Sequence, residues 1–169
     1  MSDTGMLERD ILRLAQQEER LQFERFDREA AWDLGCRIRA LCQSHGVSLA
    51  IEVRLGRQSI FWCSMPGTSG VNEDWVRRKR NTVELFERSS YAVGRELERD
   101  AETLEAKMGL STRDFASFGG GFPIIVAGLG CVGAVTVSGA PQRQDHALVV
   151  EALAGMCGVP LPEVVLELD

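Results

Sequence analysis

The sequence contains no run of about 20 apolar residues, the length needed to span a lipid bilayer, so we expect no membrane span. It also lacks excess positive charge: 19 Lys and Arg stand against 25 Asp and Glu, for a net charge of −6. Phosphate binding depends on positive charge, so nucleic acid is not an expected partner. The first ten residues are polar and lack the apolar run of a secretory signal, which favours a cytoplasmic location.

Motifs for metal binding and for common nucleophiles are missing as well. The five cysteines form no Cys-X-X-Cys pair, and His45 and His146 are the two histidines. We therefore expect reduced, mostly buried thiols and no metal site. No Gly-X-Ser-X-Gly elbow is present, which argues against an α/β-hydrolase. Residues 119–121 are all glycine, but Pro123 and a strand pattern follow them, so a tight turn is favoured over a phosphate-binding loop.

Hydrophobic periodicity predicts alternating helices and hairpins. Apolar residues at helical spacing indicate helices over 4–20 and 28–44, and strict alternation indicates a strand over 47–55. The other expected elements are a short strand near 21–26, a strand over 59–65, one long helix from a cap at Asn72 to about Arg99, a short helix over 101–108, strands over 124–127 and 131–138, and a helix over 142–156 that starts at Pro141. The acidic tail after residue 157 contains two prolines and is expected to be extended or to pair with a partner.

The order of these elements predicts a single domain over residues 1–169, with its core at about 7–157 and a tail at 158–169. Within each of the two hairpins no helix separates the strands, which implies antiparallel pairing. The expected fold class is therefore α/β (α+β), with one antiparallel sheet of about five strands covered by amphipathic helices.

A basic cluster at residues 77–80 permits two interpretations. Arg78, Thr82, Phe86 and Ser89 follow one another at intervals of four, four and three, so on one long helix they would share a face. An arginine beside hydroxyl groups can hold a carboxylate or a phosphate. The alternative is a solvated face on which neighbouring acidic residues pair with the cluster.

His146 also permits two interpretations. It lies on an apolar stripe at helical spacing with Val149, Val150 and Leu153, which suits a core histidine with a satisfied hydrogen bond. The alternative is a pocket histidine that acts as an acid, a base or a ligand, with Asp145 beside it. Residues 138–141 precede the same helix, and free N–H groups at a helix start can bind an anion.

Several segments taken together resemble the haem-degrading-domain superfamily of GlcG/HbpS-like proteins, and most of all its short cytosolic branch of unknown function. The resemblance covers about residues 7–155, and the segments that carry it are Ile51-Glu52-Val53-Arg54, Pro66-Gly67-Thr68-Ser69, Asp74-Trp75-Val76-Arg77-Arg78-Lys79, Ser89-Ser90-Tyr91, Gly119-Gly120-Gly121-Phe122-Pro123-Ile124 and Val135-Thr136-Val137-Ser138-Gly139 through to Asp145-His146.

This resemblance implies a profilin-like α/β/α sandwich with helices on both faces of the sheet. It also implies homo-oligomers built from dimers, and haem or a corrinoid as candidate ligands. One position departs from the pattern: the branch usually carries a histidine just before the glycine turn, and this chain has Phe118. A ligand or base supplied by that histidine would be absent here.

Three functions fit these observations, and an oligomeric protein that binds a tetrapyrrole or an anionic metabolite ranks first. In it, Arg78 would pair with the anion and His146 would orient or ligate it; the expected ligand-binding residues are Arg78, Ser89, Gly120, Phe122, Ser138 and His146. An interaction or scaffold protein without a ligand ranks second. An enzyme with His146 as general acid–base, oriented by Asp145, ranks third.

Overall fold

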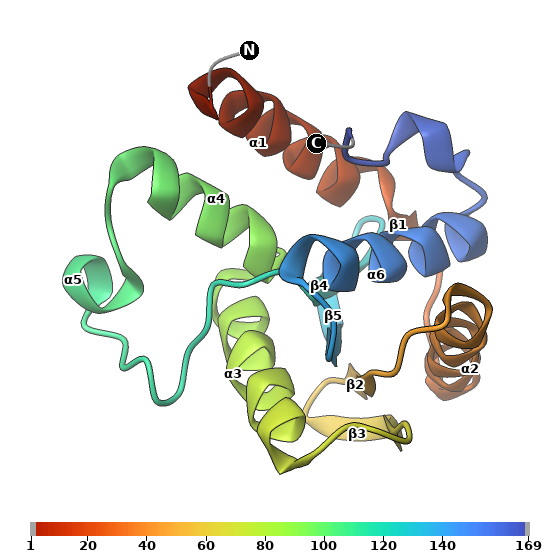
Figure 1. Ribbon diagram of the computed structural model, residues 1–169. Helices are drawn as coiled ribbons and strands as arrows, with labels where there is room; N and C mark the ends of the chain where they lie inside the picture. The colour runs from red at the N-terminus through yellow and green to blue at the C-terminus, as the bar shows by residue number, and fades with distance from the viewer. Residues whose placement is uncertain (1–2, 168–169) are drawn as a thin grey trace.

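The computed structural model describes residues 3–167, and a single five-stranded sheet in the order β1-β4-β5-β2-β3 organises them (Figure 1). The strands are β1 (Gln22–Phe23), β2 (Ala50–Leu55), β3 (Gln58–Ser64), β4 (Gly121–Val126) and β5 (Gly130–Ser138). The β2–β3 and β4–β5 hairpins are antiparallel, as predicted. The sheet is nevertheless mixed, because β1 pairs with β4 in parallel, so the expectation of a purely antiparallel sheet was wrong at this edge.

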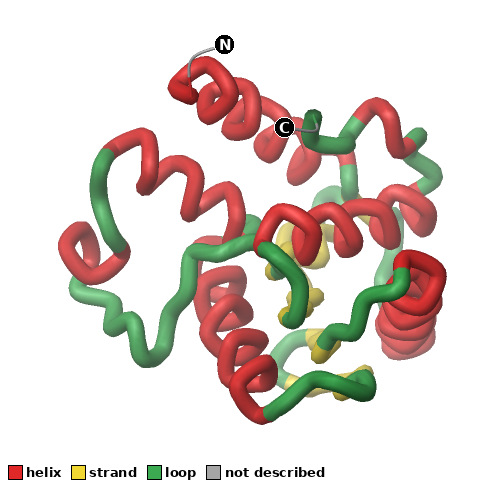
Figure 2. The backbone as a smooth tube through the Cα atoms, in the orientation of Figure 1, coloured by secondary structure: helices red, strands yellow, loops and turns green. Residues whose placement is uncertain are grey.

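Helices cover both faces of the sheet, which confirms the sandwich architecture. The helices are α1 (Asp3–Arg20), α2 (Arg28–His45), α3 (Gly70–Phe86), α4 (Ser90–Asp100), α5 (Leu104–Met108) and α6 (Gln142–Cys157). Helices α2 and α6 pack together on one face of the sheet, and α3 packs on the other (Figures 1 and 2). Helix α4 joins the sandwich to α1, and α5 lies at its periphery.

The main core lies between the sheet and the α2–α6 layer. The alternating residues of each central strand that point to this side are fully buried, including Ile51, Val135 and Phe122. The opposite alternation points toward α3 and carries polar groups: Glu52, which is 3% exposed, forms an ion pair with Arg80 of α3 at 2.8 Å. Polar contacts are therefore found between the sheet and α3.

The long helix predicted from Asn72 to about Arg99 was wrong, because the chain forms two helices there. Helix α3 ends where Glu87 adopts a left-handed backbone with φ 53°, and Ser89 then caps α4 by accepting a hydrogen bond from Ala92 N at 3.1 Å. A serine side chain competes with helical hydrogen bonding in this way. The start of α3 also differs: Ser69 is its N-cap, and Asn72 completes a capping box by accepting from Ser69 N at 2.9 Å.

The tail after α6 folds back onto α1 and is more than an extended strand. It forms a 3-10 turn, η1 (Leu161–Glu163), and buries Val164 completely. The Gln17 side-chain amide of α1 donates to Val164 O at 2.6 Å, which fixes the tail to the first helix. Within residues 3–167, no helix combines the length and the hydropathy that crossing a membrane requires.

Candidate functional site

Two pockets adjoin where α3, the segment after α5 and the start of α6 come together. The first pocket has a volume of about 350 Å³ and lies between α3, α4 and the 109–119 segment. The second has a volume of about 330 Å³ and lies between the first turns of α3 and α6 and the end of β5. Phe118 and Gln142 line both pockets, so the two pockets are neighbours and together make up the candidate site.

Arg78 is the cation on the α3 side of the first pocket. Its Nη1 donates to Thr112 O at 3.1 Å, and its Nε lies 3.1 Å from Asp74 Oδ2. The guanidinium also stacks over the Trp75 ring, 3.9 Å from the ring centroid. These contacts hold the guanidinium in place, and its Nη2 makes no hydrogen bond to any residue the structure describes.

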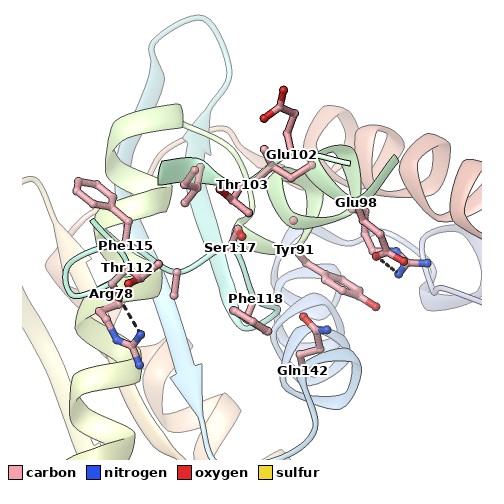
Figure 3. A pocket seen from close by; sticks show the side chains of 15 residues that line it. Arg78, Tyr91, Glu98, Glu102, Thr103, Thr112, Phe115, Ser117, Phe118 and Gln142 are labelled. Carbon is pink, nitrogen blue, oxygen red and sulfur yellow. Dashed lines mark hydrogen bonds and ion pairs between the residues drawn. The ribbon is translucent and has the colours of Figure 1, made fainter. Parts of the chain in front are cut away.

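The opposite side of the first pocket carries Tyr91 and Gln142, with Phe118 between them and Arg78 (Figure 3). Phe118 is 46% exposed, which is unusual for so large an apolar side chain, and its ring contacts Trp75 edge-on with centroids 5.3 Å apart. An exposed aromatic wall beside a fixed guanidinium can bind the apolar body and the anionic group of one molecule.

Lys79 and Asp145 form a buried ion pair beside the second pocket. The Lys79 Nζ donates to Asp145 Oδ2 at 3.0 Å and to Val137 O at 3.1 Å, and the two side chains are 4% and 1% exposed. Burial lowers the pKa of Lys79 and raises the pKa of Asp145, while their mutual attraction opposes both shifts.

Asp145 occupies the backbone donors that precede α6. Its Oδ1 accepts from Ala140 N at 3.0 Å, so this carboxylate takes the place at which we expected a bound anion to meet a free N–H. The N–H of residue 140 is therefore committed within the protein. A ligand in the second pocket would have to use side-chain donors instead.

His146 is buried and lines neither of the two pockets. It is 1% exposed, its Nε2 lies 2.7 Å from Gln17 Oε1, and it packs against the rings of Tyr91 and Phe122. Burial, reinforced by the charge of Arg143, lowers the pKa of His146 to about 3, so the ring is neutral at pH 7. Its Nδ1 makes no hydrogen bond within the described part of the chain.

The other predicted site residues divide between the pockets and the framework. Ser138 lines the second pocket. Gly120, with φ 126°, lies directly against Lys79, since an added Cβ would sit 2.9 Å from its Nζ. Phe122 is fully buried in the main core, and Ser89 is the cap of α4 and no longer shares a helical face with Arg78.

Sequence reasoning missed Lys79, Asn72 and Gln142 as site residues. A signal for Lys79 was present, because Val76, Lys79 and Val83 share one apolar helical face and all three are buried. A lysine on such a face needs a partner. The partner, Asp145, lies 66 positions further along the chain and could not be found by local spacing.

No metal centre is evident in the region that the structure describes, since no three His, Cys, Asp or Glu side chains gather to hold an ion. Haem iron takes a His, Cys, Met or Tyr as its protein ligand. Among the residues that line the two pockets, Tyr91 is the one of these types; it is 4% exposed and accepts a hydrogen bond from Arg143 at 3.4 Å. These pockets therefore do not fit the ligation of haem iron.

Comparison with known proteins finds a family model and close relatives. Residues 26–154 match the family model described as haem degrading protein HbpS-like. A UPF0303 protein of Azotobacter vinelandii is 50% identical over 161 residues, covering 95% of this chain and 97% of the relative. A UPF0303 protein of Serratia proteamaculans is 47% identical over 155 residues, covering 92% of this chain and 96% of the relative.

Solved structures share the fold. The crystal structure of Ybr137w protein matches with a TM-score of 0.81 and 25% identity, over 94% of this chain and 96% of that one. HbpS matches with a TM-score of 0.62 and 18% identity, over 80% of this chain and 92% of that one. The PduOC:Heme complex matches with a TM-score of 0.62 and 17% identity, over 72% of this chain and 87% of that one.

Proposed function

The chain belongs to the HbpS-like family, and from this membership and the geometry above we propose that it binds a small anionic molecule in the two pockets that meet at Phe118 and Gln142. The observation that carries the proposal is the exposed Phe118 ring between two pockets, with a fixed arginine on one side. Pockets of this size fall in the range of about 300–1,000 Å³ that small-molecule sites occupy.

The first pocket offers an apolar surface for the body of a ligand and, on its α3 side, a positive charge for the anionic group. Leu97, Leu104, Phe115 and Phe118 contact the body of the ligand, and Arg78 pairs with its anionic group. The pairing uses Nη2, which makes no hydrogen bond to any described residue. Hydrogen bonds between charged groups are the stronger ones, so Arg78 contributes orientation as well as affinity.

Haem is a candidate through the family name and through a neighbour whose crystal structure is a PduOC:Heme complex. The two pockets lack a suitable ligand for iron, and the position before the glycine turn is Phe118. We therefore favour a ligand held by its anionic group and its apolar body. A tetrapyrrole that bound here would be held by its ring and carboxylates.

Native mass spectrometry of the protein purified from the organism that encodes it tests the proposal. We expect extra mass from a retained molecule, and a loss of that mass in Arg78→Ala. Arg99→Ala is the matched control, because Arg99 is an exposed arginine of α4 that pairs with Asp100 and lines neither pocket.

A panel of carboxylates, phosphates and tetrapyrroles gives a second readout through the thermal stability of the protein, since a ligand that binds the native state raises Tm. An apo protein with no thermal shift from any compound would contradict the proposal. So would binding that Arg78→Ala leaves unchanged.

We also propose that the chain forms a homo-oligomer through β3, the outer strand of the sheet. This strand carries no charged residue and no proline, the features that protect an exposed edge from pairing. Two large exposed side chains lie at this edge: Trp62, in the strand itself, is 40% exposed, and Trp32 of α2, which packs on Phe61, is 52% exposed. A second copy that pairs antiparallel along the same strand would bury these groups symmetrically.

Light scattering after size exclusion tests this interface. Trp62→Lys places a charge on the strand and is expected to lower the mass to that of a smaller assembly. Leu129→Lys, in the exposed turn that joins β4 to β5, is the control and keeps the wild-type mass. An unchanged mass in Trp62→Lys, or a monomeric wild type, would rule the β3 interface out.

A further inference from the structure

We infer that the second pocket is a subsite for a carboxylate, a group that accepts hydrogen bonds and donates none. The inference rests on the proposed function and assigns the chemistry of one end of the ligand. It follows from how the polar atoms that line this pocket are already committed inside the protein.

The oxygens of three side chains on this wall already accept hydrogen bonds from within the protein. Asn72 Oδ1 accepts from Ser69 N at 2.9 Å, and Gln142 Oε1 accepts from Gly119 N at 3.1 Å. The two oxygens of Asp145 accept from Ala140 N and from Lys79 Nζ, both at 3.0 Å. A ligand that donated hydrogen bonds here would meet oxygens that each already have one partner.

The donors on the same wall are not used up. The amide nitrogens Nδ2 of Asn72 and Nε2 of Gln142 make no hydrogen bond to any described residue, and neither does the hydroxyl of Ser138. Lys79 Nζ has three N–H groups and two acceptors, Val137 O and Asp145 Oδ2. The side-chain nitrogens of Asn72 and Gln142 and one N–H of Lys79 are therefore available to donate to a ligand.

Burial gives this imbalance a free-energy consequence. Ser138 is 5% exposed and Lys79 is 3% exposed, so bulk water cannot solvate them freely. A donor that water reaches poorly gains a hydrogen bond when a ligand oxygen binds beside it. An acceptor that enters the pocket therefore gains more than it would on an open surface.

The charges at the site favour a carboxylate over a phosphate. Lys79 is the cation that lines the pocket, and Asp145 already neutralises it. The start of α6 adds a partial positive charge. Because Lys79 is already paired, this partial charge supports one negative charge better than two, and the second charge of a phosphate would add to the repulsion from Asp145.

Titration with benzoate, followed by NMR of the side-chain amides, tests the inference. We expect benzoate to shift the amide signals of Asn72 and Gln142. Benzylamine presents a donor on the same ring and is expected to leave both signals in place. Inorganic phosphate is expected to leave them in place as well.

Asn72→Asp removes the donor and keeps the oxygen that completes the capping box at the start of α3, so the helix is preserved. We expect this variant to weaken benzoate binding by at least about tenfold, because it removes one charge-assisted hydrogen bond and adds a like charge beside the bound carboxylate. Ser138→Ala removes a second donor and is expected to weaken it as well. Gly70→Asp is the matched control: it adds the same charge to the same helix turn at a residue that does not line the pocket, and should change affinity by less than about twofold.

The outcomes separate this inference from the proposed function. If benzoate binds and Arg78→Ala weakens it, while the amides of Asn72 and Gln142 stay unshifted, the carboxylate subsite is overturned and the proposed function stands. Shifts from benzylamine or phosphate that equal those from benzoate also overturn it. If no compound binds either pocket and no retained molecule is found, both fail.

Discussion

The ammonium of Lys79 lies 3.0 Å from the carboxylate of Asp145, and this contact joins helices on opposite faces of the sheet. Lys79 belongs to α3 and Asp145 to the first turn of α6. The lysine reaches its partner past Gly120, where a side chain would collide with Val137 O and with the ammonium itself. The ion pair thus fixes the two helices that form the second pocket.

Breaking this pair from one side should be strongly destabilising. Lys79→Met leaves Asp145 buried without its partner, and we expect the free energy of unfolding to fall by about 3–5 kcal/mol. Urea denaturation measures the change. The double variant Lys79→Met/Asp145→Leu should lose less than the two single variants together, because it leaves no orphan charge. A loss below about 1 kcal/mol in Lys79→Met would show that the pair carries little of the stability.

Ser89 should be important for stability and dispensable for ligand binding. Its hydroxyl caps α4, and it lines neither pocket. We expect Ser89→Ala to reduce the free energy of unfolding by about 1 kcal/mol and to leave ligand affinity unchanged. Parallel denaturation and titration experiments separate the two effects. Weaker binding with unaltered stability would show instead that Ser89 contributes to ligand binding.

Gly35 allows α2 to approach the sheet closely. A Cβ at this position would lie 2.1 Å from the ring of Phe61, so Gly35→Ala must displace either the ring or the helix. We expect a loss of about 1–3 kcal/mol, typical of an overpacked core. Gly70→Ala is the control, because nothing lies within 4 Å of its added methyl and its φ is not in the left-handed region. That substitution should be neutral or slightly stabilising in the same denaturation assay.

His146 should make the protein sensitive to acid. Its pKa is lowered from 6.5 to about 3, so between these values the unfolded chain binds a proton that the folded chain does not. Stability is therefore complete above pH 6.5 and declines as the pH falls toward 3, by about 2 kcal/mol between pH 7.5 and pH 5.

Urea midpoints at pH 7.5 and pH 5 measure this loss. His146→Gln removes the titrating ring, so it should show a smaller decline over the same interval. His45→Gln, which changes a surface histidine paired with Glu151, should keep the wild-type decline. Equal declines in wild type and His146→Gln would place the acid sensitivity elsewhere.

The elements of the fold followed from local patterns where those patterns were long and regular. The helix over 28–44 and the strand over 131–138 appear almost as expected, because amphipathic periodicity and strand alternation are properties of neighbouring residues. The parallel pairing of β1 with β4 was not predicted, since Gln22 and its partner Ile125 are distant in the sequence. The split at residues 87–89 was missed because a serine cap was taken for a helical position.

Part of the candidate site was also predictable from local sequence. Arg78, Ser138 and Asp145 were identified by residue type and by their position near a helix or turn, and each lines one of the pockets. The position of His146 in the core was not predictable, because it depends on a distant segment. Gln17 of α1 packs on the histidine and makes a hydrogen bond to it.

The sequence by itself determined the alternation of helices and hairpins and the apolar faces that pack into a sandwich, because these depend on intervals of a few residues. Only the tertiary structure decided which polar groups are paired and which are left to meet a ligand. That choice depends on contacts such as Lys79 with Asp145, between residues 66 positions apart that the fold brings within hydrogen-bond distance.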